Sequence, residues 1–161
     1  MACFVAPLMY HRTTEASRIP PRVCEHFLLR PAPQVGLPSR TRIGHVHLHV
    51  AHLADSERFY SEILGFELRQ RFGRSALFLA AGGYHHHIGL NTWAGVGAPP
   101  PPPGAVGLRH FEVQLPDLGS LDKLIARVRE AGVPITDTPG GAHVADPSGN
   151  AVRLLAPPQS K

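Results

Sequence analysis

The chain has 161 residues, of which 43% are hydrophobic and 17% are charged, and its formal net charge is +4. This length and composition fit one compact domain, or two very small modules that share a core, and argue against a wholly disordered chain. No apolar run reaches the roughly 18 residues that a membrane span needs. The two cysteines, Cys3 and Cys24, lie near the N-terminus. A membrane span, a disulfide framework and a cysteine-rich zinc site are therefore excluded for the rest of the chain.

The excess positive charge belongs to the first 42 residues, which contain six arginines and two glutamates. The other residues contain ten basic and ten acidic side chains and show no basic stripe of the kind that phosphate binding requires. We therefore expect no nucleic-acid partner. The leading segment is rich in proline and shows no sustained period of 2 or 3.6. We expect residues 1–41 to form a disordered or organelle-targeting extension outside the core, with a short docking arm as a third alternative.

After residue 42 the hydrophobic pattern becomes regular. Segment 43–53 alternates, with histidines on one face and apolar residues on the other, and predicts a half-buried strand. A helix follows, and we expect Asp55 or Ser56 to cap it and Gly65 to end it. Glycine turns then separate three further strands, which are predicted over residues 66–72, 75–79 and 85–91.

The same order of elements recurs after a proline-rich connector at 97–104. The second copy begins with a strand in segment 109–118, which repeats the first strand at an offset of 65 residues, and its helix ends at Gly132. Three strands are predicted after that helix, over residues 133–137, 141–145 and 151–155. We therefore predict an α+β fold of two βαβββ modules, residues 42–96 and 105–157, which share one core in a single domain over 42–157.

One face of each predicted sheet is unusually polar. Because the helix of a module must cover the apolar face of its sheet, the other face looks into the space that the two modules enclose. Imidazoles on rigid strands are suitable ligands for a first-row divalent metal. The register of the fourth strand places His86 on the helix side or at the strand end. The side chains expected on the polar face are His45, His47, His49, His85, His87, Asn91, His110, Glu112, Gln114 and Arg153.

Five motifs in this order resemble the vicinal oxygen chelate superfamily, which includes glyoxalases, extradiol ring-cleaving dioxygenases and bleomycin-resistance proteins. The motifs are GHVHLHV, FYSEILGFEL, GGYHHHIGLNTWAG, RHFEVQLPD and DPSGN. Within that superfamily, the stretch YHHHIGLNTW is most similar to the catechol-2,3-dioxygenase-like branch. The resemblance implies paired modules that form an open cup around a divalent metal, with Fe(II) favoured and zinc, manganese or nickel as alternatives.

The resemblance also implies that the metal ligands come from the first and last strands of each module. Carried over to this chain, these positions fall on His45, His87 and His110. The fourth position, a glutamate in the family, falls on Arg153, and a guanidinium group has no lone pair to offer a cation. Glu112 shares a strand face with His110, and we expect it to replace the missing carboxylate as a ligand.

Arg153 leaves three alternatives open. The metal is retained on the three histidines and Glu112, or it is lost and Arg153 pairs with Glu112 or an anionic ligand, or Arg153 faces solvent. The spare histidines either line the cavity or move protons during catalysis. We expect the catalytic histidines to be His47, His49 and His85, and the substrate or anion contacts to be Arg153, Asn91 and Trp93.

These observations predict a metal-dependent enzyme that resembles extradiol ring-cleaving dioxygenases and acts on a small catechol-like or other oxygen-rich molecule. One alternative is a glyoxalase-type isomerase or lyase with Glu112 as its base. Another is a non-catalytic small-molecule binding protein of the bleomycin-resistance kind with a degenerate metal site. The expected partners are a small-molecule substrate and a second copy in a homodimer, with no nucleic acid and no membrane. The expected location is the cytoplasm, and organellar targeting by the leading segment is the alternative.

Overall fold

The computed structural model describes residues 36–37, 41 and 43–157. Contacts divide the chain into two compact units, Met1–Ile43 and Gly44–Lys161, and every helix and strand described below belongs to the second. The extension predicted for residues 1–41 falls, apart from residues 36–37 and 41, outside the described residues.

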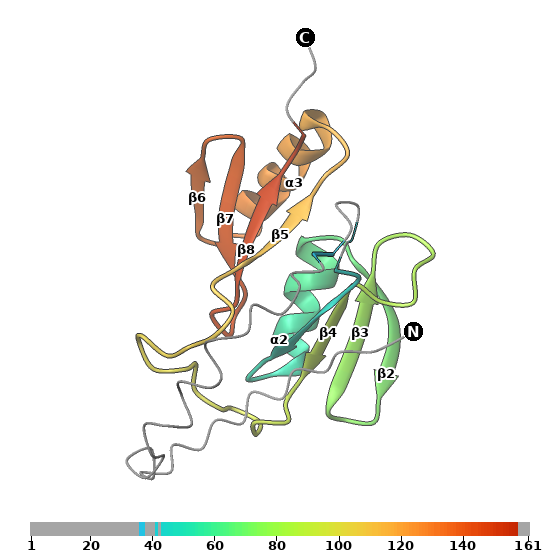
Figure 1. Cartoon of the computed structure of the whole chain (residues 1–161), viewed down its shortest axis with the longest axis vertical. Coiled ribbons are helices and arrows are strands. Elements are labelled where there is room, and N and C mark those ends of the chain that lie inside the picture. The colour runs from blue at the N-terminus through green and yellow to red at the C-terminus, as the bar shows by residue number, and fades with distance from the viewer. Residues whose placement is uncertain (1–35, 38–40, 42, 158–161) are drawn as a thin grey trace. The chain divides into compact units, whose positions relative to one another are not determined.

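The first module contains one helical segment and a four-stranded sheet with the order β1-β4-β3-β2 (Figure 1). Strand β1 pairs with β4 in parallel, whereas β3 is antiparallel to both β4 and β2. The elements are β1 (Val46–His49), α2 (Leu53–Glu57) with its π-helical continuation η1 (Arg58–Ile63), β2 (Glu67–Phe72), β3 (Ala76–Ala80) and β4 (Ile88–Asn91).

The second module repeats this topology, with the sheet order β5-β8-β7-β6. Its first and last strands again pair in parallel and its other neighbours are antiparallel. The elements are β5 (Phe111–Gln114), α3 (Leu118–Glu130), β6 (Ile135–Thr138), β7 (Gly141–Ala145) and β8 (Ala151–Leu155). The predicted α+β fold of two βαβββ modules is confirmed.

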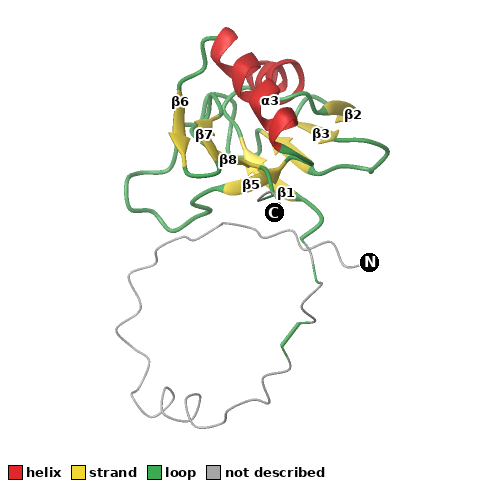
Figure 2. Cartoon of the chain, turned by 90° about the horizontal axis from the view of Figure 1, so that it is seen from above, coloured by secondary structure: helices red, strands yellow, loops and turns green. Residues whose placement is uncertain are grey.

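Alternation along the strands determines which face of each sheet is buried. In the first sheet, Leu48 pairs with Leu90 and Leu90 pairs with Leu77, and all three side chains are at most 4% exposed. Each such burial contributes on the order of 1.5–3 kcal/mol relative to an exposed side chain. In the second sheet the matching row of Val113, Leu154 and Ala142 is partly or fully buried. Figure 2 shows the helices on one side of the strands, so these rows form the helix side of a two-layer fold.

The start of the first helix differs from the prediction. The helix begins at Leu53, and His52 is its N-cap residue without a side-chain cap hydrogen bond, so the prediction of Asp55 or Ser56 as the cap was wrong. Asp55 instead lies in the first turn, and the buried Ser56 hydroxyl donates to the His52 carbonyl at 2.9 Å. Ser56 thus uses its hydroxyl inside the helix, where it bonds the carbonyl one turn earlier.

Strand β4 is shorter than predicted. The sequence predicted a strand over 85–91, but the strand begins at Ile88, which pairs with Val46 of β1. Residues 85–87 therefore precede the strand and do not follow its strict alternation of faces.

The two modules contact each other through their helices and through the turn before β8. The buried Tyr60 hydroxyl donates to Asp146 Oδ2 at 3.1 Å. In the opposite direction, Arg127 of α3 donates to the carbonyls of Ile63 and Leu64 at 2.6 and 2.9 Å. The two Arg127 bonds satisfy backbone carbonyls at the end of the first helix that have no partner within the helix. Together with the Tyr60 bond, they connect the two modules.

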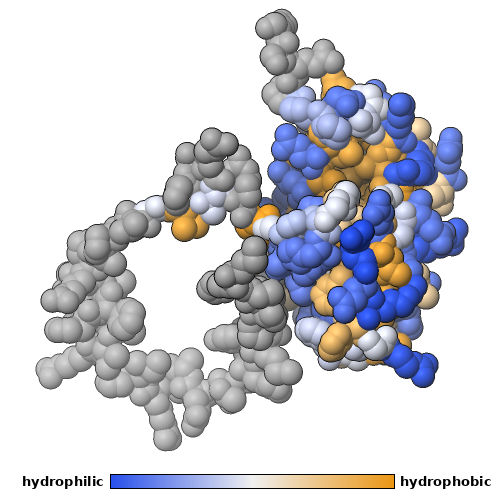
Figure 3. Space-filling model, turned by 90° about the vertical axis from the view of Figure 1, so that its right-hand side faces the viewer, coloured by the Kyte–Doolittle hydropathy of each residue, from blue (hydrophilic) through white to orange (hydrophobic). Residues whose placement is uncertain are grey.

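On the face seen in Figure 3, hydrophilic side chains surround several apolar patches. Among the described residues, no helix has the length and apolar character needed to cross a membrane.

Candidate functional site

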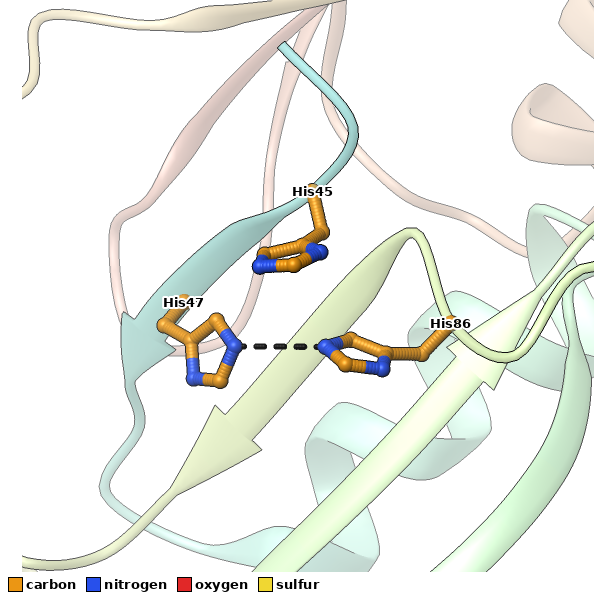
Figure 4. Close-up of side chains that lie close together, drawn as sticks. All are labelled: His45, His47 and His86. Carbon is orange, nitrogen blue, oxygen red and sulfur yellow. Dashed lines mark hydrogen bonds between the residues drawn. The ribbon is translucent and has the colours of Figure 1, made fainter. Parts of the chain in front are cut away.

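Three histidines gather on the face of the first sheet that lies opposite the helix. His45 lies just before β1, His47 lies in β1, and His86 lies in the loop just before β4. Because β1 and β4 are parallel neighbours, their N-terminal ends meet at one edge of the sheet. The three rings point toward one another there, as Figure 4 shows.

The ring nitrogens are close enough to share one ion. His47 Nε2 lies 3.3 Å from His86 Nε2, and one ligand nitrogen from each of the three histidines lies within 4.8 Å of the others. The His45 and His86 rings stack at a centroid distance of 4.5 Å, and the His45 and His47 rings meet edge to face at 5.4 Å. We refer to His45, His47 and His86 as the histidine cluster.

Two members of the histidine cluster, His47 and His86, have lowered pKa values. Burial first, and then the charges of the neighbouring histidines, together lower the pKa of His86 to about 4. Burial, followed by the charge of His45, also lowers the pKa of His47. Neutral imidazole is the form that binds a metal, so these two side chains are already in the ligating state at neutral pH.

The donor set fits a first-row divalent metal. Two imidazole nitrogens bound at about 2.0–2.1 Å in a tetrahedral arrangement lie about 3.3 Å apart, and this is the separation between His47 and His86. Imidazole ligands suit zinc, iron, copper and nickel. A site with three protein ligands leaves a coordination position for a substrate or water, which is typical of catalytic sites and not of structural sites.

Gly89 makes room for the His47 ring. It pairs with His47 across β1 and β4, and a Cβ at this position would lie 2.9 Å from His47 Nδ1 and 3.0 Å from Cε1. Any larger residue would therefore push the ring away from its position beside His86. Phe78, which pairs with Gly89 on the other side, borders the cluster at 4.9 Å from the His86 ring.

The other histidines of the first module lie outside the cluster. His87 Nδ1 accepts a hydrogen bond from the Ala81 backbone at 3.2 Å, and its ring packs on Tyr84. The exposed His85 ring lies 5.8 Å from the His45 ring. The side chain of His49, at the end of β1, is exposed.

In the second module the candidate ligands interact with one another. Arg153 Nη1 donates to Glu112 Oε1 at 3.0 Å, and His110 Nε2 lies 3.9 Å from the same oxygen. The pairing of Arg153 with Glu112 is the contact that the second of the three alternatives requires. Neither His110 nor Glu112 belongs to the histidine cluster, which is the metal-capable group found among the described residues.

The two remaining candidate contacts differ in exposure. Asn91 is 4% exposed, and its Oδ1 accepts a hydrogen bond from the Trp93 backbone at 3.2 Å, so it shapes the turn after β4. The Trp93 side chain is 56% exposed and leaves a large aromatic surface in contact with solvent.

The sequence pattern missed His86 as a site residue. A strand register carried back from Ile88 and Leu90 puts His86 on the helix side, but the chain leaves the ladder before this position. The signal available was the Gly82-Gly83 pair, which ends the preceding hairpin strand only a few residues earlier. If the connection after this glycine pair is expected to extend to residue 87, His86 lies outside the strand, and the alternation of faces no longer applies to it.

This chain is similar to one known protein family and to a curated protein of that kind. The family model of the glyoxalase/bleomycin resistance protein/dioxygenase superfamily matches residues 42–154. A catechol-2,3-dioxygenase from Bacillus subtilis (strain 168) is 48% identical over 119 residues, which are 73% of this chain and 42% of the relative. The chain therefore spans less than half the length of that curated relative.

Solved structures share the fold. Leishmania major glyoxalase I is 27% identical with a TM-score of 0.56, over 72% of this chain and 86% of that structure. An antibiotic-binding protein from Streptomyces sp. CB03234 is also 27% identical, with a TM-score of 0.54, over 76% of this chain and all of that structure. From the match over most of its length and the repeated βαβββ topology, the chain belongs to the glyoxalase/bleomycin resistance protein/dioxygenase superfamily.

Proposed function

We propose that this protein is a divalent-metal-dependent dioxygenase that opens the ring of a small catechol-like substrate, with its metal held by the histidine cluster. Iron(II) is the metal that this chemistry favours. In ring cleavage of this type both atoms of dioxygen enter the product as one carbon–carbon bond breaks, so no external reductant is consumed.

One observation carries the proposal. Three imidazoles converge within 4.8 Å beside the N-terminal ends of β1 and β4, in a chain that is 48% identical to a catechol-2,3-dioxygenase over 119 residues. A bound metal would supply Lewis acidity to the two hydroxyl oxygens of a catechol and, as iron(II), electron exchange with dioxygen. Three histidines would leave coordination positions for both reactants.

The chain's own residues have distinct roles in this proposal. His45, His47 and His86 hold the metal, and Phe78 provides an apolar wall beside the His86 ring. His85 lies beside His45 without belonging to the cluster, so it is placed to accept a proton from a catechol hydroxyl and return it to the product. Trp93 follows the C-terminal end of β4, whereas the histidine cluster lies at the N-terminal end of that strand, so Trp93 has no role at the metal in this proposal.

A non-catalytic binding function is the second candidate. The Glu112 carboxylate is engaged by Arg153 at 3.0 Å, so it is poorly available as a metal ligand or as the base of a glyoxalase-type reaction. The structural likeness to an antibiotic-binding protein adds weight to a module that holds a small molecule without converting it.

The test is oxygen uptake by the full chain loaded anaerobically with iron(II) and supplied with a panel of substituted catechols. We expect uptake coupled to formation of a ring-opened product, and loss of both in His47→Ala. Arg129→Gln is the matched control, because it removes a charged side chain from an exposed ion pair with Asp137. Iron binding with unchanged catechol levels would contradict the proposal, and tight catechol binding without turnover would favour the binding function.

A further inference from the structure

A row of polar side chains crosses the second sheet on the face opposite α3. Arg153 of β8 pairs with Glu112 of β5 on one side and with His143 of β7 on the other. His110 lies on the same face, two residues before Glu112. The neighbouring positions in β8, Val152 and Leu154, are buried on the helix side. We refer to Arg153, His110, His143 and Glu112 as the arginine row.

Donors outnumber acceptors in this row. Glu112 Oε1 accepts from Arg153 Nη1 at 3.0 Å and lies 3.9 Å from His110 Nε2. The His110 and His143 rings are 5.7 Å apart. Arg153 Nε is buried and has no hydrogen-bond partner among the described residues. One carboxylate therefore faces one guanidinium and two imidazoles, and it leaves part of the guanidinium unsatisfied.

The geometry of the row favours a carboxylate ligand. Guanidinium is a planar fork whose parallel N–H bonds match the two oxygens of a carboxylate. The Arg153 and His110 side chains are 33% and 32% exposed, so a small molecule can reach them while part of each stays out of water. The flat imidazole faces beside the fork suit an aromatic ring attached to the carboxylate.

We propose that the arginine row is a binding site for the carboxylate of a small aromatic molecule, with Glu112 occupying the guanidinium when no ligand is bound. The ligand's carboxylate forms two hydrogen bonds with Arg153 and displaces the Glu112 side chain, which is 48% exposed and can turn to solvent. Applied to the reaction, the site predicts a catechol that carries a carboxylate; that extension rests on the proposed function.

The test is calorimetric titration of the full chain with benzoate after removal of metals by chelation and dialysis. Arg153→Gln should weaken benzoate binding by about tenfold or more, because a hydrogen-bonded charge is lost. Glu112→Gln should strengthen it by about twofold to fivefold, because the internal competitor is worth no more than an exposed ion pair. Arg129→Gln, which breaks the exposed ion pair with Asp137 on the same module, should leave it unchanged.

The outcomes separate this site from a merely structural ion pair. A structural pair predicts no benzoate binding by the wild type and no gain in Glu112→Gln, and either result would overturn the proposal. Arg153→Lys keeps the charge but lacks the fork, so weaker binding by this variant supports the site even where Arg153→Gln fails to fold. Phenol should not bind, and phosphate should bind more weakly than benzoate; equal binding of phenol contradicts carboxylate recognition. Metal-free protein is used throughout, so failure of the dioxygenase proposal leaves this test intact.

Discussion

The two modules place the same rows of positions across their sheets and use them differently. On the helix side both rows are apolar, with leucines in the first module and a valine, a leucine and an alanine in the second. On the opposite face the chemistry diverges. The paired residues there are His47, Gly89 and Phe78 in the first sheet and Glu112, Arg153 and His143 in the second.

The difference follows from what each face has to do. The helix-side positions must fill a close-packed interior, so the repeat retains apolar side chains there. The opposite face does not line this close-packed interior, so its side chains can differ between the two modules. In the first sheet the absence of a side chain at Gly89 admits an imidazole, whereas at the matching position of the second sheet Arg153 brings a permanent positive charge. Under our two proposals, the first module binds the metal and the second binds the anion.

Removal of a cluster histidine should have the largest effect and is the most direct way to break this comparison. We expect His47→Ala to lower the affinity for cobalt(II) by about a hundredfold or more, since even residues that merely orient metal ligands are worth about 10–100-fold. His143→Ala in the second sheet should leave the cobalt(II) affinity unchanged. Calorimetric titration of the metal-free chain measures both. A loss in His110→Ala as large as that in His47→Ala would mean that the metal site spans both modules.

A larger residue at Gly89 tests whether the first module positions its metal ligands, because it changes no ligand residue itself. In Gly89→Ala the new Cβ would approach His47 Nδ1 to 2.9 Å, so the ring must move away from His86. We expect a loss of about tenfold in cobalt(II) affinity, the scale found when a ligand loses its orientation. Gly83→Ala is the matched control, since a Cβ at Gly83 has nothing within 4 Å. Equal affinities in the two variants would show that Gly89 does not position His47.

The fold could be predicted from the sequence because its signals are local and occur twice. Alternation in β1 and β5, and the glycines that end both helices, each require only a few neighbouring residues. The repeat then links the two halves, since neither module of this size is expected to be stable alone. The fold class therefore depended on no single element boundary.

The candidate site could be predicted only in part, because its last member depends on long-range pairing. His45 and His47 share a face through the alternation of one strand. The position of His86 depends on where β4 starts to pair with β1, about 40 residues earlier in the chain, and no local pattern encodes that. The helix cap was also missed: the first helix begins at Leu53, which packs against the core, and its N-cap residue His52 makes no side-chain cap hydrogen bond.

The contacts between the modules offer a third, smaller test. Tyr60 and Arg127 each lie five residues before the glycine that ends their helix, and each donates to the other module. Tyr60→Phe removes one donor to Asp146, which still accepts from the Ser148 and Asn150 backbones at 2.8 Å. We expect the free energy of unfolding to fall by about 1 kcal/mol.

Chemical denaturation measures this loss, and Tyr84→Phe is the control. The Tyr84 hydroxyl packs against Gly44 on a side chain that is 39% exposed, so its removal should change stability little. Equal stabilities of Tyr60→Phe and the wild type would mean that packing alone joins the helices at this point.

The smallest expected effect concerns the helix N-termini, since α3 has a side-chain cap and α2 has none. Asp117 caps α3 and accepts from the Ser120 backbone at 2.7 Å and the Ser120 hydroxyl at 3.0 Å, and these bonds lower its pKa below the ordinary 3.8. Because the folded-state pKa is lowered, the stabilisation is complete above pH 3.8 and is lost as the pH falls through the folded-state value. Asp117→Ala should therefore lower the melting temperature at pH 7, and the gap to the wild type should narrow toward pH 2. His52→Ala, at the uncapped start of α2, should show no such gap at either pH. A gap for Asp117→Ala that stays constant with pH would mean that the charge of this cap does not contribute to stability.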